Sequence, residues 1–306
     1  MVNSNCHNKD ASTLYFVDQL PPELLTIFNK LDITRYSMKD GREIAIYKLR
    51  NEIKDNLILM LPYGVSVSVL LKLIESLSNH FNVICWESVG CPDNTIHIND
   101  YDYHLISQSL LLKDIIDDQA LDDFHMVSWC QASQIVIHSL MNYEILPKSI
   151  SLISPAGMGC SNSTSEFDRS GLPLYLDIEK NGLAYAKQLL KLMQGYVKKD
   201  SINDDSISLS KIHLFDAECT LRFSSYMKSY VNNIDIVNDL LPEFFKQFSV
   251  LSIHSSDDNY THVSETLELQ KKYYNVSSKI YDTGGHLLIY KEPDLIAKEI
   301  LKYSMK

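Results

Sequence analysis

Apolar and polar residues alternate over residues 33–49, and this alternation predicts the first two strands of the chain. Residues 33–38 and 43–49 each follow a two-residue period, which is typical of a strand with one buried face. Residues 39–42, with the sequence Lys-Asp-Gly-Arg, form a turn signal between them. The pattern predicts an antiparallel hairpin at the edge of a sheet.

Later in the chain the apolar residues form continuous runs instead of alternating. Such runs are typical of strands that are buried on both faces of a parallel sheet. Residues 56–61 form such a run and are predicted to be a buried strand, and further strands are predicted at residues 82–86, 124–129, 148–154, 249–254 and 278–281. Helical spacing of apolar residues between these runs predicts helices at residues 66–79, 103–117, 134–140, 263–273 and 293–303. Strands and helices that alternate in this way predict an α/β fold, a mostly parallel sheet flanked by helices.

The alternation stops between residues 155 and 247. This segment is polar and in places rich in Ser and Asp, but residues 183–190 and 223–230 have helical patterns. A structureless loop of this length is uncommon in a compact domain, so we interpret residues 155–247 as an inserted helical cap. The remaining chain divides into an N-terminal arm at residues 1–32 and a core formed by residues 33–154 and 248–306.

Composition and charge exclude some kinds of partner. The 306 residues carry a formal net charge of −11, which argues against nucleic acid or an anionic membrane as a partner. No apolar run reaches about 18 residues, so no membrane span is expected, and the polar N-terminus lacks the pattern of a secretory signal. The six cysteines show no metal-site spacing, and their spread suggests free thiols in the cytoplasm. We expect no metal and no cofactor, because the chain also lacks a glycine-rich phosphate loop.

A sharp turn between a strand and a helix is predicted around Cys130. The apolar strand ends at Trp129 and a helical pattern starts within a few residues, which leaves almost no room for a loop. Ser128 and Ala132 lie two positions before and after Cys130, and small residues are needed there because the backbone folds tightly. An isolated cysteine is more often a small buried apolar residue. At the apex of such an elbow, next to a helix N-terminus, we interpret Cys130 as a nucleophile.

Two further motifs follow strands of the predicted sheet, and their order resembles that of the α/β-hydrolase superfamily. One is the segment Ser-Ser-Asp-Asp-Asn-Tyr at residues 255–260, and the other is Gly-Gly-His ending at His286. The resemblance covers residues 33–303 apart from the cap, and it implies the order nucleophile, acid, histidine. It assigns the acid to Asp258, with Asp257 as the competing candidate. His286 follows Asp258 by 28 residues (286 − 258) and is assigned as the base.

These residue types suit nucleophilic catalysis. A thiol reacts as its thiolate, and both a helix N-terminus and a neighbouring imidazole favour that form. His286 is expected to take the proton of Cys130 and to return one to the leaving group. Asp258 is expected to fix the tautomer of His286 and to stabilise its protonated form. The remaining candidates are expected to be strand-end or surface histidines, namely His125, His138, His254 and His262.

The resemblance also implies an oxyanion hole and a pocket. The N–H of Gln131, directly after the nucleophile, is one expected donor. The N–H of Val65 is the other, because the superfamily places His-Gly where Tyr63 and a glycine stand here. Tyr63, Glu87 and Trp129 are possible pocket residues. The chain departs from the superfamily pattern in its cysteine nucleophile, which replaces the usual serine, and in the loss of the elbow glycines.

A cysteine nucleophile forms a thioester, and exchange of one thioester for another is close to thermoneutral. We therefore expect a thioesterase or acyltransferase that acts through a covalent acyl-cysteine. The expected substrate is a small-molecule or carrier-bound acyl group, with coenzyme A or an acyl carrier protein as the carrier, held under the cap. Residues 61–65 and 85–90 look similar to stand-alone α/β-hydrolases that accompany polyketide or peptide assembly lines, which suggests specialised-metabolite biosynthesis.

Three other functions fit the same residues. One is the hydrolysis of carboxylesters by the same triad. Another is non-hydrolytic chemistry in the same pocket, as in a lyase or a cyclase. The third is a catalytically silent protein that uses the cap pocket to bind a ligand or partner. Faster turnover of esters than of thioesters favours the first, and a Cys130 no more reactive than an unfolded thiol favours the third.

Overall fold

The computed structural model describes residues 20–50, 55–89, 99–158, 165–197 and 216–305. The first 19 residues of the predicted arm lie outside this part of the chain. The rest of the arm contains helix α1 (Pro22–Phe28), whose apolar side chains Leu24, Ile27 and Phe28 are buried against the core. Proline at the first helical position suits this start, because the N–H that it lacks has no partner within a helix.

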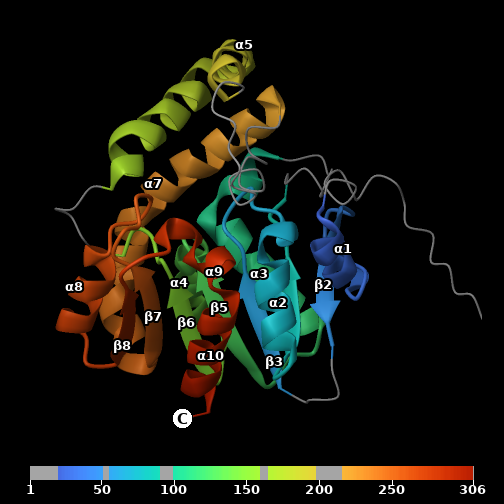
Figure 1. Ribbon diagram of the computed structural model, residues 1–306, viewed down its shortest axis with the longest axis vertical. Coiled ribbons are helices and arrows are strands. Elements are labelled where there is room, and N and C mark those ends of the chain that lie inside the picture. The colour runs from blue at the N-terminus through green and yellow to red at the C-terminus, as the bar shows by residue number, and fades with distance from the viewer. Residues whose placement is uncertain (1–19, 51–54, 90–98, 159–164, 198–215, 306) are drawn as a thin grey trace, which may run out of the picture.

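An eight-stranded sheet forms the centre of the molecule, in the order β1-β2-β4-β3-β5-β6-β7-β8 (Figure 1). The strands are β1 (Asp32–Ser37), β2 (Glu43–Leu49), β3 (Asn56–Met60), β4 (Asn82–Trp86), β5 (Phe124–Trp129), β6 (Ser149–Ile153), β7 (Val250–Ser255) and β8 (Val276–Tyr281). β1 pairs antiparallel with β2 and β2 with β4, whereas the strand pairs from β4 to β8 are parallel. The prediction of a mostly parallel sheet with an antiparallel edge hairpin is therefore confirmed.

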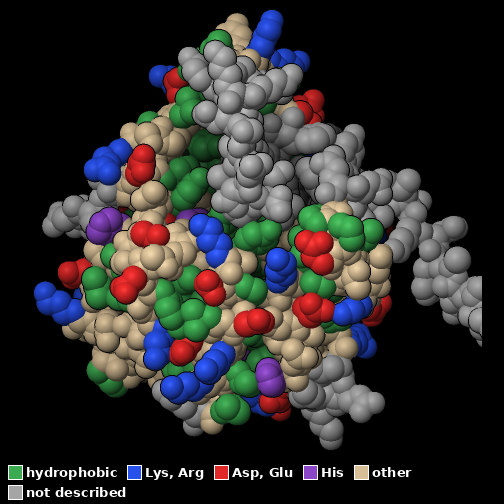
Figure 2. Space-filling view, in the orientation of Figure 1, with side chains coloured by type: hydrophobic (Ala, Val, Ile, Leu, Met, Phe, Trp, Pro, Cys, Tyr) green, Lys and Arg blue, Asp and Glu red, His purple; other side chains and the backbone are tan. Residues whose placement is uncertain are grey.

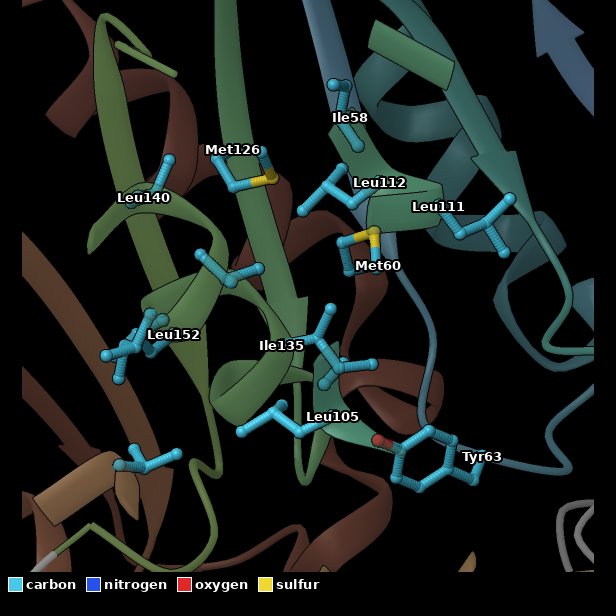
Figure 3. Close-up of a cluster of buried hydrophobic side chains, with 14 of the residues drawn as sticks. Ile58, Met60, Tyr63, Leu105, Leu111, Leu112, Met126, Ile135, Leu140 and Leu152 are labelled. Carbon is cyan, nitrogen blue, oxygen red and sulfur yellow. The ribbon is translucent and has the colours of Figure 1, made fainter. Parts of the chain in front are cut away.

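Alternate side chains of the central strands point to opposite faces, and each face has its own hydrophobic cluster. In β3, Leu57 and Leu59 pack with α1, α2 (Leu71–Ser78) and α10 (Pro293–Ser304). Ile58 and Met60 pack on the other face with α3 (Leu105–Asp118), α4 (Ala132–Asn142) and α8 (Ser264–Lys272), and Figure 3 shows part of this cluster. Burial on both faces explains why these strands are continuous apolar runs. Basic and acidic side chains are interspersed over the outer face shown in Figure 2, as expected for amphipathic helices.

Between β6 and β7, the described residues form two long helices, α5 (Leu172–Val197), which is kinked at Gly182, and α7 (Ala217–Gln247). The helical patterns at residues 183–190 and 223–230 lie within them. α5 packs along the first part of α7, and both project away from the sheet (Figure 1). The last part of α7 belongs to the core cluster, where Val237, Leu241 and Phe244 are buried. The predicted cap therefore contributes its last helical turns to the core.

The strand ends that carry the predicted site residues meet at one edge of the sheet, because parallel strands end in the same direction. The residues that follow these ends are Val65 after β3, Cys130 after β5, Asp258 after β7 and His286 after β8. Helix α7 crosses this edge, since Tyr226 stacks on Tyr63 with ring centroids 4.2 Å apart. The cap thus lies next to the predicted site. Over the described residues, no helix is both long and apolar enough to cross a membrane.

A buried ion pair ties the edge hairpin to the start of α3. Arg42, in the turn between β1 and β2, donates from Nη1 and Nη2 to the two carboxylate oxygens of Asp102 at 2.6 and 2.9 Å. The Asp102 side chain is 2% exposed, and it also accepts the N–H of Asn99 at 2.7 Å. Two parallel N–H···O bonds are the strongest geometry for such a pair. The pair holds the edge of the sheet against the helix layer.

Asp102→Asn is expected to lower the free energy of unfolding by about 2–3 kcal/mol, because the largely buried guanidinium of Arg42 loses its buried anionic partner and keeps only the more exposed Asp40. Lys39→Ala is the matched control, since the Lys39–Asp114 pair spans 3.1 Å at the surface and the lysine side chain is 81% exposed. The control is expected to cost less than about 0.5 kcal/mol. Urea unfolding of both variants measures the difference, and equal losses would contradict a special role for Asp102.

Candidate active site

Cys130 lies in a strained elbow between β5 and α4. Its φ of 55° is in the left-handed region, which costs energy for a residue with a side chain. The Cys130 N–H donates to Ile153 O at 2.9 Å, and its carbonyl accepts Ser133 N–H at 3.1 Å. Beneath the elbow the buried hydroxyls of Ser128 and Ser133 are 3.1 Å apart, so small side chains fill the space where larger ones would clash. These contacts maintain the strained conformation of a thiol that is only 5% exposed.

Two glycines turn the chain after β8 and bring His286 back toward the elbow. Gly284 and Gly285 have φ values of 130° and 61°. A Cβ at Gly284 would lie 2.5 Å from Leu288 Cδ1, so the first position has no room for a side chain. His286 follows in the short helix η7 (Gly285–Leu287), before α9 (Leu288–Lys291). Because glycine has no Cβ, both residues adopt positive φ values at little cost, and the loop can turn His286 toward the elbow.

The structure places Asp258, and not Asp257, beside the predicted base. His286 Nδ1 is 3.0 Å from Asp258 Oδ2. Asp258 Oδ1 accepts the N–H groups of Tyr260 and Thr261 at 2.8 and 3.0 Å. Asp257 instead accepts the N–H of Gly285 at 2.7 Å. The two carboxylates that sequence reasoning left in competition thus have different contacts: one meets the imidazole and the other holds its loop.

The charges around His286 favour its protonated form. Burial alone would lower the pKa of this imidazole, but the negative charges of Cys130 and Asp258 raise it to about 10. Burial likewise would raise the pKa of Asp258, yet the charge and hydrogen bond of His286 hold it well below its usual range. Hydrogen bonds of His286 to Asp258 and to Cys130 act in the same direction and also raise the pKa of the imidazole. The arrangement is an imidazole placed between a carboxylate and a sulfur.

Two aromatic rings pack against the His286 imidazole. The centroid of Trp129 is 5.4 Å away, and that of Tyr260 is 4.9 Å away. Tyr260 stacks in turn on Phe167 at 5.3 Å, a residue that begins the helix η5 (Phe167–Gly171) before α5. The N–H of Phe167 also donates to Asn259 O at 3.0 Å. The sequence predicted Trp129 as a possible pocket residue but did not point to Tyr260 or Phe167. No local pattern marks an aromatic residue that will pack against a histidine from another segment.

The two predicted oxyanion donors are in different states. The N–H of Gln131 has no hydrogen-bond partner within the described part of the chain. The N–H of Val65 donates to Pro62 O at 3.3 Å inside a turn. The preceding N–H, of Gly64, donates to Ser88 Oγ at 3.0 Å. One donor is therefore ready to bind a negative oxygen, and the other needs a shift of its loop.

The remaining predicted pocket residues, Tyr63 and Glu87, have contacts with residues other than Cys130, Asp258 and His286. Tyr63 is 1% exposed and stacked on Tyr226, and its position in the cluster is seen in Figure 3. Burial raises the pKa of its phenol above the usual value. Glu87 is also 1% exposed, and its Oε1 accepts the N–H of Val67 at 2.7 Å, where the helix η3 (Val67–Leu70) begins. These contacts give Tyr63 and Glu87 structural roles in this conformation.

Three of the other histidines lie away from Cys130. His262 is exposed and contacts Ser264 Oγ at 2.7 Å. His125 contacts Ser149, and His138 contacts Ser109. His254 differs, because its Nε2 lies 3.5 Å from Asp258 Oδ2 in the interior.

Comparisons with known proteins establish the fold. No protein-family model and no curated protein matches this sequence. A protein described as a lipase candidate from Acinetobacter baumannii has 16% identity and a TM-score of 0.72, with 98% of both chains covered. A haloalkane dehalogenase from Bradyrhizobium elkanii has 10% identity and a TM-score of 0.68, with 90% of this chain and 96% of the other covered. An α/β hydrolase fold protein from Burkholderia ambifaria has 15% identity and a TM-score of 0.66, with 88% and 97% covered. The chain therefore has the α/β-hydrolase fold.

Cys130→Ser and Asp258→Asn are each expected to shift the titration of His286 to lower pH than the value of about 10. The direction follows because each change removes a negative charge that favours the imidazolium. Titration followed by nuclear magnetic resonance of the imidazole measures it, and Cys219→Ser, at a buried cysteine on α7, is the matched control. Titration of His286 near its ordinary value of 6.5 in the unmodified chain would contradict the charge arrangement.

Proposed function

We propose that this chain is a cysteine-dependent acyl-transfer enzyme, a thioesterase or acyltransferase that forms a covalent acyl-cysteine on Cys130. The observation that carries the proposal is the 3.0 Å contact between His286 Nδ1 and Asp258, with His286 close enough to Cys130 for the sulfur to raise its pKa. The fold supports the same class of chemistry, because structures of similar fold include a membrane phospholipase A and a serine hydrolase. In this chain a cysteine stands at the elbow.

The chemistry balances as two acyl exchanges. In the first, Cys130 Sγ attacks the acyl carbon of a thioester, the bond from that carbon to the donor sulfur breaks, and the leaving sulfur takes a proton from His286. In the second, an acceptor thiol, amine or water gives a proton to His286 and attacks the acyl carbon, and the bond to Cys130 breaks. Asp258 keeps the proton on Nδ1, so that Nε2 performs both transfers. Gln131 N–H donates to the oxygen that becomes negative, a contact typically worth about 3 kcal/mol.

The charge on Cys130 supports an exchange in two stages. While the sulfur is negative, the pKa of His286 is about 10, and the ring is a proton donor for the leaving group. Acylation makes the sulfur neutral and removes the main influence that raises this pKa. His286 then becomes a proton acceptor suited to activating the second substrate. The same residue therefore changes role when the acyl group is bound.

The oxyanion donors favour thioesters over carboxylesters as substrates. Of the two expected donors, Gln131 has an N–H with no partner among the described residues, whereas Val65 N–H is held by Pro62 O at 3.3 Å. A thioester exchanged for a thioester is close to thermoneutral and has a good leaving group. An ester has a poorer leaving group and depends more on a complete oxyanion hole. Hydrolysis of carboxylesters by the same triad remains the alternative, and faster turnover of esters than of thioesters would favour it.

Incubation with acetyl and octanoyl N-acetylcysteamine thioesters is expected to add one acyl group, which intact-mass spectrometry detects and peptide mapping places on Cys130. Cys130→Ala is expected to give no adduct. His286→Ala is expected to acylate at least about 100-fold more slowly, because the leaving sulfur has no proton donor.

Two outcomes would count against the covalent mechanism. One is the absence of any adduct on the unmodified chain. The other is an adduct of equal yield in Cys130→Ala, which would show acylation elsewhere. Cys85→Ala and Cys219→Ala are matched controls, because both cysteines are buried and burial raises the pKa of both thiols. Alkylation of Cys130 by iodoacetamide at the rate of an unfolded thiol would support a silent binding protein instead.

A further inference from the structure

A second histidine lies against the carboxylate of Asp258. His254 is near the end of β7, its side chain is fully buried, and its Nε2 is 3.5 Å from Asp258 Oδ2. The same oxygen receives His286 Nδ1 at 3.0 Å. Two imidazoles therefore face one buried carboxylate, although only one of them lies near Cys130. The sequence assigned His254 no role beyond the strand end.

The contacts of His254 define which of its nitrogens carries the proton. Nε2 is 3.0 Å from Thr261 O, and a carbonyl oxygen only accepts, so Nε2 must donate. Nδ1 is 2.9 Å from Thr266 Oγ1 and accepts the hydroxyl proton of that residue. Thr266 Oγ1 lies 2.8 Å from Ser252 Oγ, which supplies a donor in return. The network is satisfied by a neutral ring with its proton on Nε2.

Burial agrees with the neutral form. It lowers the pKa of His254, while Asp258 raises it and the nearby His286 and His262 lower it further. The fully buried position in β7 would be filled at lower desolvation cost by an apolar residue. The imidazole of His254 has hydrogen-bond partners at both ring nitrogens. Its Nε2, the donor, faces the segment that contains Asp258.

Thr261 connects His254 to the acid. Its carbonyl accepts from His254, while its N–H and its hydroxyl donate to Asp258 Oδ1 and Oδ2, both at 3.0 Å. Thr261 is thus held by the His254 ring through its carbonyl, and it presents one backbone donor and one side-chain donor to the Asp258 carboxylate. Loss of the His254 donor would leave the Thr261 carbonyl unsatisfied in the interior, which favours rotation of this turn.

We propose that His254 is a positioning residue that, as its neutral Nε2–H tautomer, fixes Thr261 and so directs the Asp258 carboxylate toward His286. This inference rests on the proposed function, because positioning matters only if Asp258 and His286 serve Cys130. His254 does not touch the reacting atoms. His254 acts on His286 through Asp258, and it affects how the His286 imidazole is aligned and protonated.

The tautomer is tested directly by nitrogen-15 chemical shifts of His254 in the unmodified protein at pH 7. The expected result is a proton on Nε2 and none on Nδ1, because the contacts allow no other neutral form. A proton on Nδ1, or a doubly protonated ring at this pH, would overturn the proposal. This measurement needs no substrate, so its outcome is independent of whether Cys130 forms an acyl adduct.

A pair of variants separates positioning from packing. His254→Gln keeps an N–H near the position of Nε2, and His254→Leu keeps only the bulk. In the leucine variant the titration of His286 is expected at lower pH than in the unmodified chain, and alkylation of Cys130 by iodoacetamide at pH 7 about fivefold slower, the effect of one lost hydrogen bond. In the glutamine variant both properties are expected close to those of the unmodified protein.

His138→Leu is the matched control, because this histidine is also buried and its Nδ1 contacts Ser109 Oγ at 2.9 Å, away from Asp258. It is expected to lower the stability to urea while leaving the His286 titration and the alkylation rate unchanged. If His254→Leu behaves like His138→Leu in all three measurements, His254 is a core residue only. Absence of an acyl adduct alongside an altered His286 titration would instead reject the acyl-transfer function and retain the positioning role.

Discussion

The contact between His286 and Asp258 is the interaction on which the candidate site depends. These residues follow β8 and β7, while Cys130 follows β5, so the base reaches the elbow across two intervening strands. Asp258 is kept ionised in the interior because each of its oxygens has donors, from the backbone of Tyr260 and Thr261, from the Thr261 hydroxyl and from the imidazole. A buried carboxylate with fewer donors would be costly. The same contacts that stabilise the ionised carboxylate of Asp258 also orient the imidazole of His286.

The cap and the base share contacts. Phe167, at the start of the cap helices, stacks on Tyr260, and Tyr260 stacks on His286. Trp129, the last residue before the elbow, also packs against the imidazole. An imidazolium beside aromatic rings is stabilised by their electron density, which acts in the same direction as the neighbouring negative charges. A movement of the helices that begin at Phe167 would therefore change the surroundings of His286.

Much of the architecture follows from residue patterns. The continuous runs of the central strands require burial on both faces, so the parallel sheet was predictable. The alternation in β2 predicted one polar face, but this strand is buried on both faces because it lies between β1 and β4 with a hydrophobic cluster on each side. The elbow was predictable because Ser128 and Ala132 leave room for a tight turn at Cys130, and the glycines before His286 marked a loop that turns back. The site was less predictable where a contact joins distant segments. Examples are the ring of Tyr260 on His286, the carboxylate of Glu87 at the start of η3, and the turn that engages Val65 N–H.

Local sequence by itself determined the periodicity of the strands and helices, the sharp turn at Cys130 and the order of thiol, acid and imidazole along the chain. These are short-range properties, fixed by side-chain size, backbone freedom and apolar spacing. Only the tertiary structure decided that Asp258 rather than Asp257 meets His286, because neighbouring residues in a loop point in different directions once their hydrogen bonds form. It also placed His254 behind Asp258. The role of a buried polar side chain depends on the donors and acceptors that surround it. These groups belong to segments that are distant in the sequence and meet only in the folded chain.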